Sequence, residues 1–332
     1  MIGITTNYLK ETILKYYLIC DYREKFESNE PSDHYSYNSV MKMRETINLL
    51  GFDCEYFGGV QELLHAANTK EYDKNGIYLN LNDGIKTISK RGQTPILLEY
   101  MQVKYSGSSP LTHLIISDKY FTNDYLNNKI PNLFIPKCIL VKKERDLESI
   151  DLQFPIILKP NDEGSSIGIF PDSLCYTIRE AKKVYRRIKD YKVLAQQFIK
   201  GYELTDYFIR SNTGKILFNE LLIVSKGKSP VMDDMLFTPD DKFNHHRTYY
   251  NPIDVIGREI TNDIKKITNL IAAQFNILTL GRVDYRYSEN KLYFIEANTI
   301  PAFSKTSEIG KICTIYHYDY NNIVKLLLQS ID

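Results

Sequence analysis

Three side chains that carry hard oxygen atoms lie close together near the end of the chain. Asp284 lies in the run GRVDYRY, and Glu296 and Asn298 lie in KLYFIEANTIP. Both runs have strand character, so Glu296 and Asn298 share a face, and a turn near Glu289 brings Asp284 nearly opposite them. Mg²⁺ prefers carboxylate and amide oxygens, with phosphates and water completing its shell. The pattern predicts a metal site; the alternative is a solvated sheet face with chance acids.

A second candidate segment, FPIILKPNDEGSSIGIF, combines an apolar strand, a Gly/Ser loop and a further strand. The strand ends at Lys159, and the loop spans Asn161–Gly168, with hydroxyls at Ser165 and Ser166. Backbone N–H groups of such a loop can hold phosphate oxygens, and Lys159 adds a positive charge. The segment matches neither the P-loop nor the Rossmann pattern. An ordinary hairpin loop is the alternative.

Three further segments are too unspecific to indicate a function on their own. Lys119 lies in IISDKYF, near the start of an expected helix, where a lysine is usually exposed. The run VLAQQFIKGYE carries Gln196, Gln197 and Glu203, and such a run can form an adenine hinge with a carboxylate for the ribose. The adjacent histidines at 245 and 246 lie in a long polar loop and are more often solvated than catalytic.

Composition narrows the class of protein. The chain has 332 residues, 43% hydrophobic and 25% charged, with a formal net charge of +1. This balance argues against a nucleic-acid binder, and no apolar run approaches the roughly 20 residues that a membrane span needs. The five cysteines show no CxxC pairing, and the N-terminus lacks the pattern of a signal peptide. A reducing cytoplasm is therefore expected.

The elements that must position these residues alternate between strands and helices. We expect a first strand at Met1–Thr5, a helix in SVMKMRETINLLGF, strands in CEYFGG and GIYLNLNDG, and a helix in PILLEYMQV. A helix is then expected in LTHLIISDKYFTNDYLNN, a strand in LFIPKCILV, a helix in SLCYTIREAKKVYRRIKDY, and strands in KVLAQQFIKGYELTDYFIR and GKILFNELLIVS. A long helix should cover DVIGREITNDIKKITNLIAAQFN, and patternless residues 228–252 are a candidate lid. Three domains follow, at 1–110, 111–194 and 195–332.

Taken in order, these segments resemble the D-alanine–D-alanine ligase family of the ATP-grasp superfamily. The resemblance begins at YLNLNDG, passes through KYSGSSPLTHLIISDKYF and LKPNDEGSSIGI, and ends with GRVDY and FIEANTIPAFSKTS. LKPNDEGSSIGI is close to the family's KPxxEGSSxG motif, and GRVDY together with FIEANTIPAFSKTS is close to its RxD…ExNTxPG motif. Roughly two-thirds of the chain is covered, in the family's order and spacing.

The resemblance implies a fold and a set of roles. The fold would combine α/β and α+β parts: an ATP-grasp fold with an N-terminal parallel-sheet domain and two α+β domains that clasp ATP. Implied contacts to ATP, with Mg²⁺ or Mn²⁺ as the metal, come from Lys119, Lys159, the Glu163–Gly168 loop with Ser165 and Ser166, the hinge residues Gln196, Gln197 and Ile199, and Glu203. Asp284, Glu296 and Asn298 would hold two metal ions. Arg282 would stabilise the transferred phosphoryl group, Ser165 would lie near the first substrate, and Ser307 would receive the second substrate's carboxylate.

Several positions depart from the family's pattern. No segment matches the N-terminal motif whose acid holds the first substrate's ammonium; Glu30 or Asp33 is the nearest substitute. The lid lysine has no direct match, and residue 242 (Lys) or Arg247 is the candidate replacement. Ala302 stands where the family has glycine, and Glu308 replaces an apolar residue beside the second substrate. A carboxylate there suits a larger or cationic second substrate better than alanine.

The sequence therefore predicts an ATP-dependent ligase that forms an amide bond through an acyl phosphate. Its expected partners are small-molecule substrates, amino acids or peptides, with no nucleic acid and no membrane. The family's frequent homodimers leave a homodimer open. Two other classes remain: an ATP-grasp kinase that phosphorylates a hydroxyl, and a non-catalytic Mg-ATP-binding protein.

Overall fold

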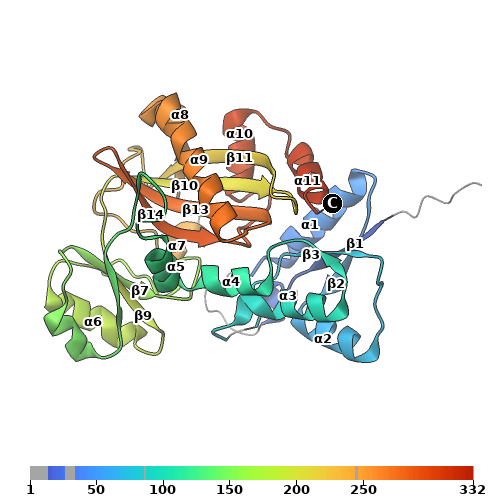
Figure 1. Ribbon diagram of the computed structural model, residues 1–332, viewed down its shortest axis with the longest axis horizontal. Coiled ribbons are helices and arrows are strands. Elements are labelled where there is room, and N and C mark those ends of the chain that lie inside the picture. Colours follow the sequence, from blue (N-terminus) through green and yellow to red (C-terminus); the bar gives the residue numbers. More distant parts are fainter. Residues whose placement is uncertain (1–13, 27–33, 86, 244–245, 332) are drawn as a thin grey trace, which may run out of the picture.

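The computed structural model describes residues 14–26, 34–85, 87–243 and 246–331. Within these residues the strands form three sheets, and helices connect strands of each sheet (Figure 1). The expected strand at Met1–Thr5 lies outside the described residues. The mixture of a parallel sheet with two mainly antiparallel ones confirms the predicted combination of α/β and α+β parts.

The N-terminal sheet is parallel, with the strand order β2-β1-β3-β4. One of its two inner strands, β1, comes from the run KYYLI, where no strand was expected. Ser36 caps the helix that follows by accepting a hydrogen bond from the backbone of Ser39. The second helix of this unit was also not expected. The bounds are β1 (Lys15–Ile19), α1 (Tyr37–Leu49), β2 (Asp53–Gly58), α2 (Val60–Thr69), β3 (Ile77–Asn80), α3 (Lys90–Met101) and β4 (Lys104–Tyr105), with a 3-10 helix at Arg23–Lys25.

The central sheet is antiparallel, with the order β6-β9-β7-β8, and one amphipathic helix, α6, covers it. Thr177 and Glu180 form a capping box that fixes the start of α6. The strand expected in IGIF is wrong: Gly168–Phe170 belongs to the loop, and the strand begins four residues later. The bounds are α4 (Pro110–Ser117), α5 (Lys119–Leu126), β6 (Cys138–Val141), β7 (Ile156–Pro160), β8 (Leu174–Cys175), α6 (Ile178–Ile188) and β9 (Val193–Gln197), with a 3-10 helix at Glu144–Ser149.

The C-terminal sheet has the order β12-β11-β10-β13-β14-β5, and β5 is its parallel edge strand. The hairpin turn at Glu289-Asn290 adopts positive φ at both residues, as a tight turn requires. The expected long helix is interrupted at Gly257, whose φ of +86° separates α8 from α9. The bounds are β5 (Leu133–Phe134), β10 (Tyr202–Arg210), β11 (Ile216–Ser225), α7 (Pro239–Phe243), β12 (Thr248–Tyr250), α8 (Pro252–Ile256), α9 (Arg258–Gln274), β13 (Thr279–Ser288), β14 (Lys291–Asn298), α10 (Glu308–Tyr316) and α11 (Tyr320–Gln329).

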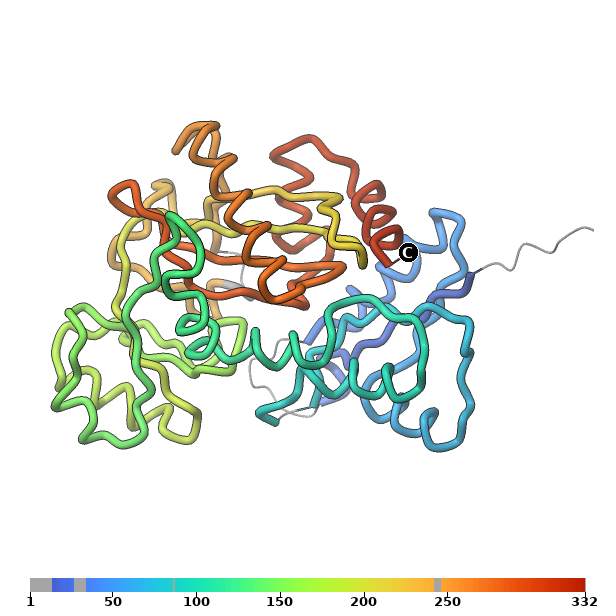
Figure 2. Tube along the Cα trace, in the orientation of Figure 1, coloured from blue at the N-terminus to red at the C-terminus, as the bar shows by residue number. Residues whose placement is uncertain are grey.

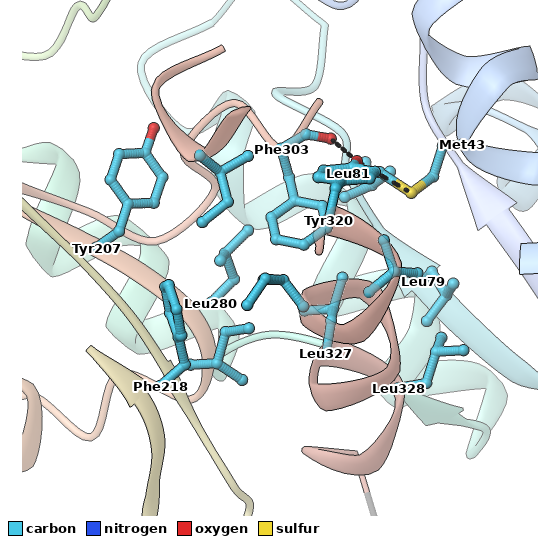
Figure 3. Close-up of a cluster of buried hydrophobic side chains, with 14 of the residues drawn as sticks. Met43, Leu79, Leu81, Tyr207, Phe218, Leu280, Phe303, Tyr320, Leu327 and Leu328 are labelled. Carbon is cyan, nitrogen blue, oxygen red and sulfur yellow. Dashed lines mark hydrogen bonds between the residues drawn. The ribbon is translucent and has the colours of Figure 1, made fainter. Parts of the chain in front are cut away.

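The N-terminal and C-terminal units share one hydrophobic core. Side chains of α1 and β3 pack against the C-terminal sheet and α11, as Figure 3 shows around Tyr320. The hydroxyl of Tyr320 also lies 3.4 Å from the carbonyl oxygen of Phe303. The central unit instead encloses a core of its own. The tube in Figure 2 shows the central unit on the opposite side of the molecule from α11. Residues of the central and C-terminal sheets together line a pocket, and pockets between domains are common ligand sites.

The domain boundaries at residues 110 and 194 remain a prediction. Strand β9 runs across residue 194, and β5, which precedes the central sheet in sequence, pairs with β14 of the C-terminal sheet.

Candidate active site

Two pockets adjoin one another among the described residues. The first lies between the central and C-terminal sheets, and the second extends from it toward the N-terminal unit. Glu203, Phe237 and Asp284 line both of them. Ten of the fourteen predicted site residues line the first pocket: Lys119, Lys159, Glu163, Ser166, Gln196, Gln197, Ile199, Glu203, Asp284 and Glu296. The other four, Ser165, Arg282, Asn298 and Ser307, line the second pocket.

The hairpin of β13 and β14 brings the predicted metal ligands onto one face. Asp284 lies directly opposite Glu296, and Arg282 lies opposite Asn298, which confirms the expected register. The Asp284 carboxylate accepts hydrogen bonds from Thr205 at 2.6 Å and from Arg282 at 2.7 and 2.9 Å. Burial raises the pKa of Asp284, with the neighbouring Glu296 adding to the effect and Arg282 opposing it.

The residues present fit a magnesium ion. Within the described residues, no group of three or more His, Cys, Asp or Glu side chains is placed to hold a metal. The set here has two carboxylates and one amide, so phosphate oxygens and water would have to complete an octahedral shell, which is how Mg²⁺ is usually held. Lys119 lies 3.3 Å and Arg282 lies 3.9 Å from Glu296, so these two cations offset part of the negative charge of the site.

Two lysines face these carboxylates from the central unit. Burial lowers the pKa of the Lys159 ammonium to about 8, against the attraction of Glu296. Lys119 begins α5 and donates hydrogen bonds to the backbone oxygens of Asn161 and Glu163. Asp118, the cap of α5, accepts a hydrogen bond of 2.8 Å from the Asn161 amide. The start of α5 and the loop after β7 are therefore fixed to each other beside the lysines.

The Gly/Ser loop separates the two pockets. Ser165 and Ser166 adopt positive φ, and Ser165 lines the second pocket while Ser166 lines the first. Gly168 also has a positive φ, of +73°, and an added Cβ would lie 2.5 Å from Pro160. Glu163 forms an ion pair of 2.9 Å with Lys90 of α3, which attaches the loop to the N-terminal unit.

Lys90 belongs to a charged cluster that the sequence analysis missed. It pairs with Asp83 at 2.9 Å, and Arg91 pairs with the same carboxylate at 2.8 Å. Burial raises the pKa of Asp83, but the two cations outweigh this effect and hold the pKa at about 2. The signal was the run of charges after GIYLNLNDG, but nothing in the sequence showed that α3 would reach the Gly/Ser loop.

The expected adenine hinge forms the wall of the first pocket. Gln196 and Gln197 end β9, and Phe198 and Ile199 continue the lining. Glu203 pairs with Arg286 at 2.7 Å, and Arg286 donates a further hydrogen bond of 2.7 Å to the backbone oxygen of Met232. Arg286 was missed, although its spacing from Arg282 and Asp284 along one strand placed it on the same face.

The lid candidate, residues 228–252, has more structure than its sequence indicated. Val231 forms an isolated bridge with Tyr202, and α7 and β12 lie within it. Phe237 of this segment reaches both pockets. The side chain of residue 242, and residue 245, lie outside what the structure describes, and His246 is exposed beside Asp240. Arg247 is the lid cation that lines the second pocket.

The far end of the second pocket is built by the segment before α10. Ser307 donates hydrogen bonds of 2.9 Å to the backbone oxygens of Ala302 and Ser304. Glu308 forms a buried ion pair with Arg247, so the carboxylate suggested for a larger or cationic substrate already has a counter-ion. Tyr35, also missed, accepts a hydrogen bond of 2.7 Å from the backbone of Phe303 and so holds this segment. Glu30 and Asp33 lie outside the described residues.

The fold and the arrangement of this site define an ATP-grasp ligase, an enzyme that forms a carbon–nitrogen bond with ATP. A family model described as D-ala D-ala ligase C-terminus matches residues 139–329, more than half of the chain. The chain belongs to the D-alanine–D-alanine ligase family.

Individual relatives agree with this assignment. The D-alanine–D-alanine ligase of Fusobacterium nucleatum is 27% identical over 263 residues, covering 78% of this chain and 81% of the relative. Among solved structures, the Bacillus anthracis D-alanine–D-alanine ligase complexed with ATP has a TM-score of 0.70 at 16% identity, covering 96% of this chain and 97% of that one. The VanG D-Ala:D-Ser ligase of Enterococcus faecalis has a TM-score of 0.72 at 16% identity, covering 96% and 99%. These structures confirm the predicted fold.

Proposed function

We propose that this protein activates a substrate carboxylate as an acyl phosphate and joins it to an amine, releasing ADP and phosphate. The observation that supports this most is the meeting of the two pockets at Asp284 and Glu203. A nucleotide in the first pocket would present its terminal phosphate at the entrance of the second. The carboxylate to be activated would bind at this entrance, beside Arg282.

The nucleotide would be held by groups from both sheets. Lys119, Lys159 and the backbone of the Gly/Ser loop would bind phosphate oxygens, because cations and exposed N–H groups both favour anions. Gln196, Gln197 and Ile199 would contact the adenine, with Glu163 and Ser166 beside the phosphates. Glu203, oriented by Arg286, would accept the ribose hydroxyls.

The metal ligands would be Asp284, Glu296 and Asn298. Bound Mg²⁺ would offset charge on the transferred phosphoryl group, as metals do in phosphoryl transfer. Arg282 lines the second pocket and pairs with Asp284 at 2.7 Å, and its guanidinium would stabilise the charge that develops on the acyl phosphate and on the tetrahedral centre that follows.

The second half of the reaction takes place in the second pocket. The amine attacks the acyl carbon, the carbon–oxygen bond to phosphate breaks, and the amine loses a proton. Ser165 would lie beside the first substrate, and Ser307 would hold the carboxylate of the second. Phe237 from the lid covers both pockets, which would exclude the water that hydrolyses an acyl phosphate.

The second substrate is proposed to differ from D-alanine. Ala302 and Glu308 stand at the end of the pocket where Ser307 lies, and Glu308 is ion-paired rather than apolar. The Enterococcus faecalis structure, a D-Ala:D-Ser ligase, shares the fold, so the fold is compatible with another acceptor.

The test is Mg²⁺-dependent ADP release from paired D- and L-amino acids, read with product masses. ADP that requires both partners, with a condensed product, supports the ligase. A stable phosphorylated small molecule would replace it with the kinase, and tight Mg-ATP binding with no turnover would indicate a non-catalytic protein. Glu296→Gln, which keeps the size of the side chain, should abolish release, whereas Lys182→Met on the outer surface of α6 should not.

The setting of the enzyme is part of the proposal. The cysteines are all free, and a ligase that consumes ATP suits the cytoplasm, where ATP is made. No helix of the described residues is long and apolar enough to cross a membrane. A homodimer remains a prediction.

A further inference from the structure

An ion pair between the lid and α10 lies in the second pocket. Arg247 precedes β12, and Glu308 is the first residue of α10. The guanidinium and the carboxylate are in contact, and their side chains are only 14% and 9% exposed. Both line the pocket together with Ser307 and Arg282. The pair therefore faces whatever occupies the far end of the site.

Aromatic groups complete the surroundings of this pair. The Tyr207 hydroxyl donates a hydrogen bond of 3.3 Å to the second oxygen of Glu308. The Arg247 guanidinium lies 5.7 Å from the centre of the Tyr249 ring. Burial raises the pKa of both tyrosines, so they are neutral at physiological pH. The wall is polar but carries no net charge, since Glu308 and Arg247 cancel.

Charge balance decides which side chains this wall accepts. Each described carboxylate that lines the second pocket is ion-paired: Asp83 with Arg91, Glu203 with Arg286, Asp284 with Arg282, and Glu308 with Arg247. A cationic side chain would add positive charge beside Arg247 and Arg282 in a partly buried space. An alkyl side chain would cover the pair and remove water from it without replacing the lost hydrogen bonds.

We propose that the Arg247–Glu308 pair selects an acceptor amino acid whose side chain is uncharged and carries a hydroxyl or carboxamide. Such a group can donate to Glu308 and accept from Arg247 without disturbing their balance. The inference rests on the proposed ligase function and specifies the acceptor class for that same site. It replaces the cationic acceptor that the sequence suggested for Glu308.

The experiment compares kcat/KM for acceptors with the purified full chain, using the donor that the amino-acid panel identifies. The acceptors are serine, asparagine, alanine, lysine and aspartate in both D and L forms. We expect serine or asparagine to exceed alanine and lysine by at least tenfold. A preference for lysine, alanine or aspartate overturns the inference while leaving the ligase intact. Absence of ADP release from every pair refutes the ligase itself, and the acceptor class with it.

The paired variant Arg247→Leu with Glu308→Leu removes both charges together and avoids an unpaired buried charge. We expect it to move the preference to alanine by about tenfold or more. An unchanged preference in a variant that still binds Mg-ATP would overturn the role of the pair. The matched control is Arg186→Leu with Glu144→Leu, a surface ion pair between α6 and the 3-10 helix at Glu144–Ser149, which should leave the ranking as it is. If the site variant fails to fold, the wild-type ranking alone decides.

Discussion

Lys159 is predicted to weaken the fold of the nucleotide-free protein, and replacing it by methionine should reveal this. Burial lowers the pKa of its ammonium from 10.5 to about 8, and the attractions of Glu296 and Glu203 are already included in that balance. Each tenfold change in proton affinity is worth about 1.4 kcal/mol, so the charged lysine costs roughly 3 kcal/mol at pH 7. Methionine has a similar shape and no charge.

Whether Lys159→Met stabilises or destabilises the protein depends on the pH at which the folded and unfolded states each release the Lys159 proton. The folded state releases the Lys159 proton near pH 8 and the unfolded state near 10.5, so at pH 7 both carry it and the folded state bears the whole cost. Lys159→Met should therefore raise the free energy of unfolding at pH 7 by roughly 2–3 kcal/mol. It should also lose ADP release, because a cation beside the phosphates is gone.

The assay is urea unfolding at pH 7 without nucleotide, followed by circular dichroism. Calorimetry with saturating Mg-ATP completes it, because a ligand at about 100 times its Kd stabilises by about 2.7 kcal/mol. Mg-ATP should raise the Tm of the wild type and raise that of the variant less. Lys182→Met, at an exposed ion pair, should change stability by about 0.5 kcal/mol or less. A variant more than about 1 kcal/mol less stable than the wild type would refute the reasoning.

Three further outcomes follow from the structure. Removing the ion pair between Glu163 and Lys90 by Lys90→Met should raise the KM for ATP several-fold, and a double-mutant cycle with Glu163→Gln should give a coupling of about 1 kcal/mol; additive effects would contradict the link. Burial raises the pKa of Asp206 to about 7, so the folded state favours the protonated carboxyl; its contribution to stability is full below about pH 4 and is lost as pH rises through 7. In urea unfolding, Asp206→Asn should match the stability of the wild type at pH 4 and exceed it by up to roughly 4 kcal/mol at pH 8. Gly168→Ala should lower stability by about 1–3 kcal/mol, measured by the same unfolding curves, because of its positive φ and the contact with Pro160; an unchanged midpoint would show that the loop adjusts.

The structural features that the sequence predicted best are those whose residues lie close together along the chain. The hairpin of β13 and β14 has alternating apolar residues and a turn at Glu289, so local rules predict that Asp284 lies nearly opposite Glu296. An irregularity in the register between Asp284 and Tyr285 supplies the one-residue shift that sets these two carboxylates directly opposite each other. The fold was predictable for a similar reason, because the motifs occur in the family's order. The roles of the site residues remain predictions.

The parts that could not be predicted depend on contacts between distant segments. Arg247 and Glu308 are 61 residues apart, and Lys90 and Glu163 are 73 apart. No periodicity relates such positions, because they meet only after three sheets have packed. The split at Gly257 is different: a glycine inside a helical pattern signals a break, and its φ of +86° shows why this one ends α8.

The pairing of charges explains how a site with so many ionised groups can be buried at all. Glu203, Asp284 and Glu308 each lie against an arginine, so their charges are compensated before any ligand contacts them. Unpaired, each would cost several kcal/mol. Binding then exchanges partners: phosphates approach the cations and a metal approaches the carboxylates, and little new charge is left uncompensated. Such exchange requires each pair to lie at a pocket wall, and all three do. Asp206, on the opposite face of β10 from Thr205, lacks a charged partner within hydrogen-bond range among the described residues, so no ion pair offsets the burial that raises its pKa.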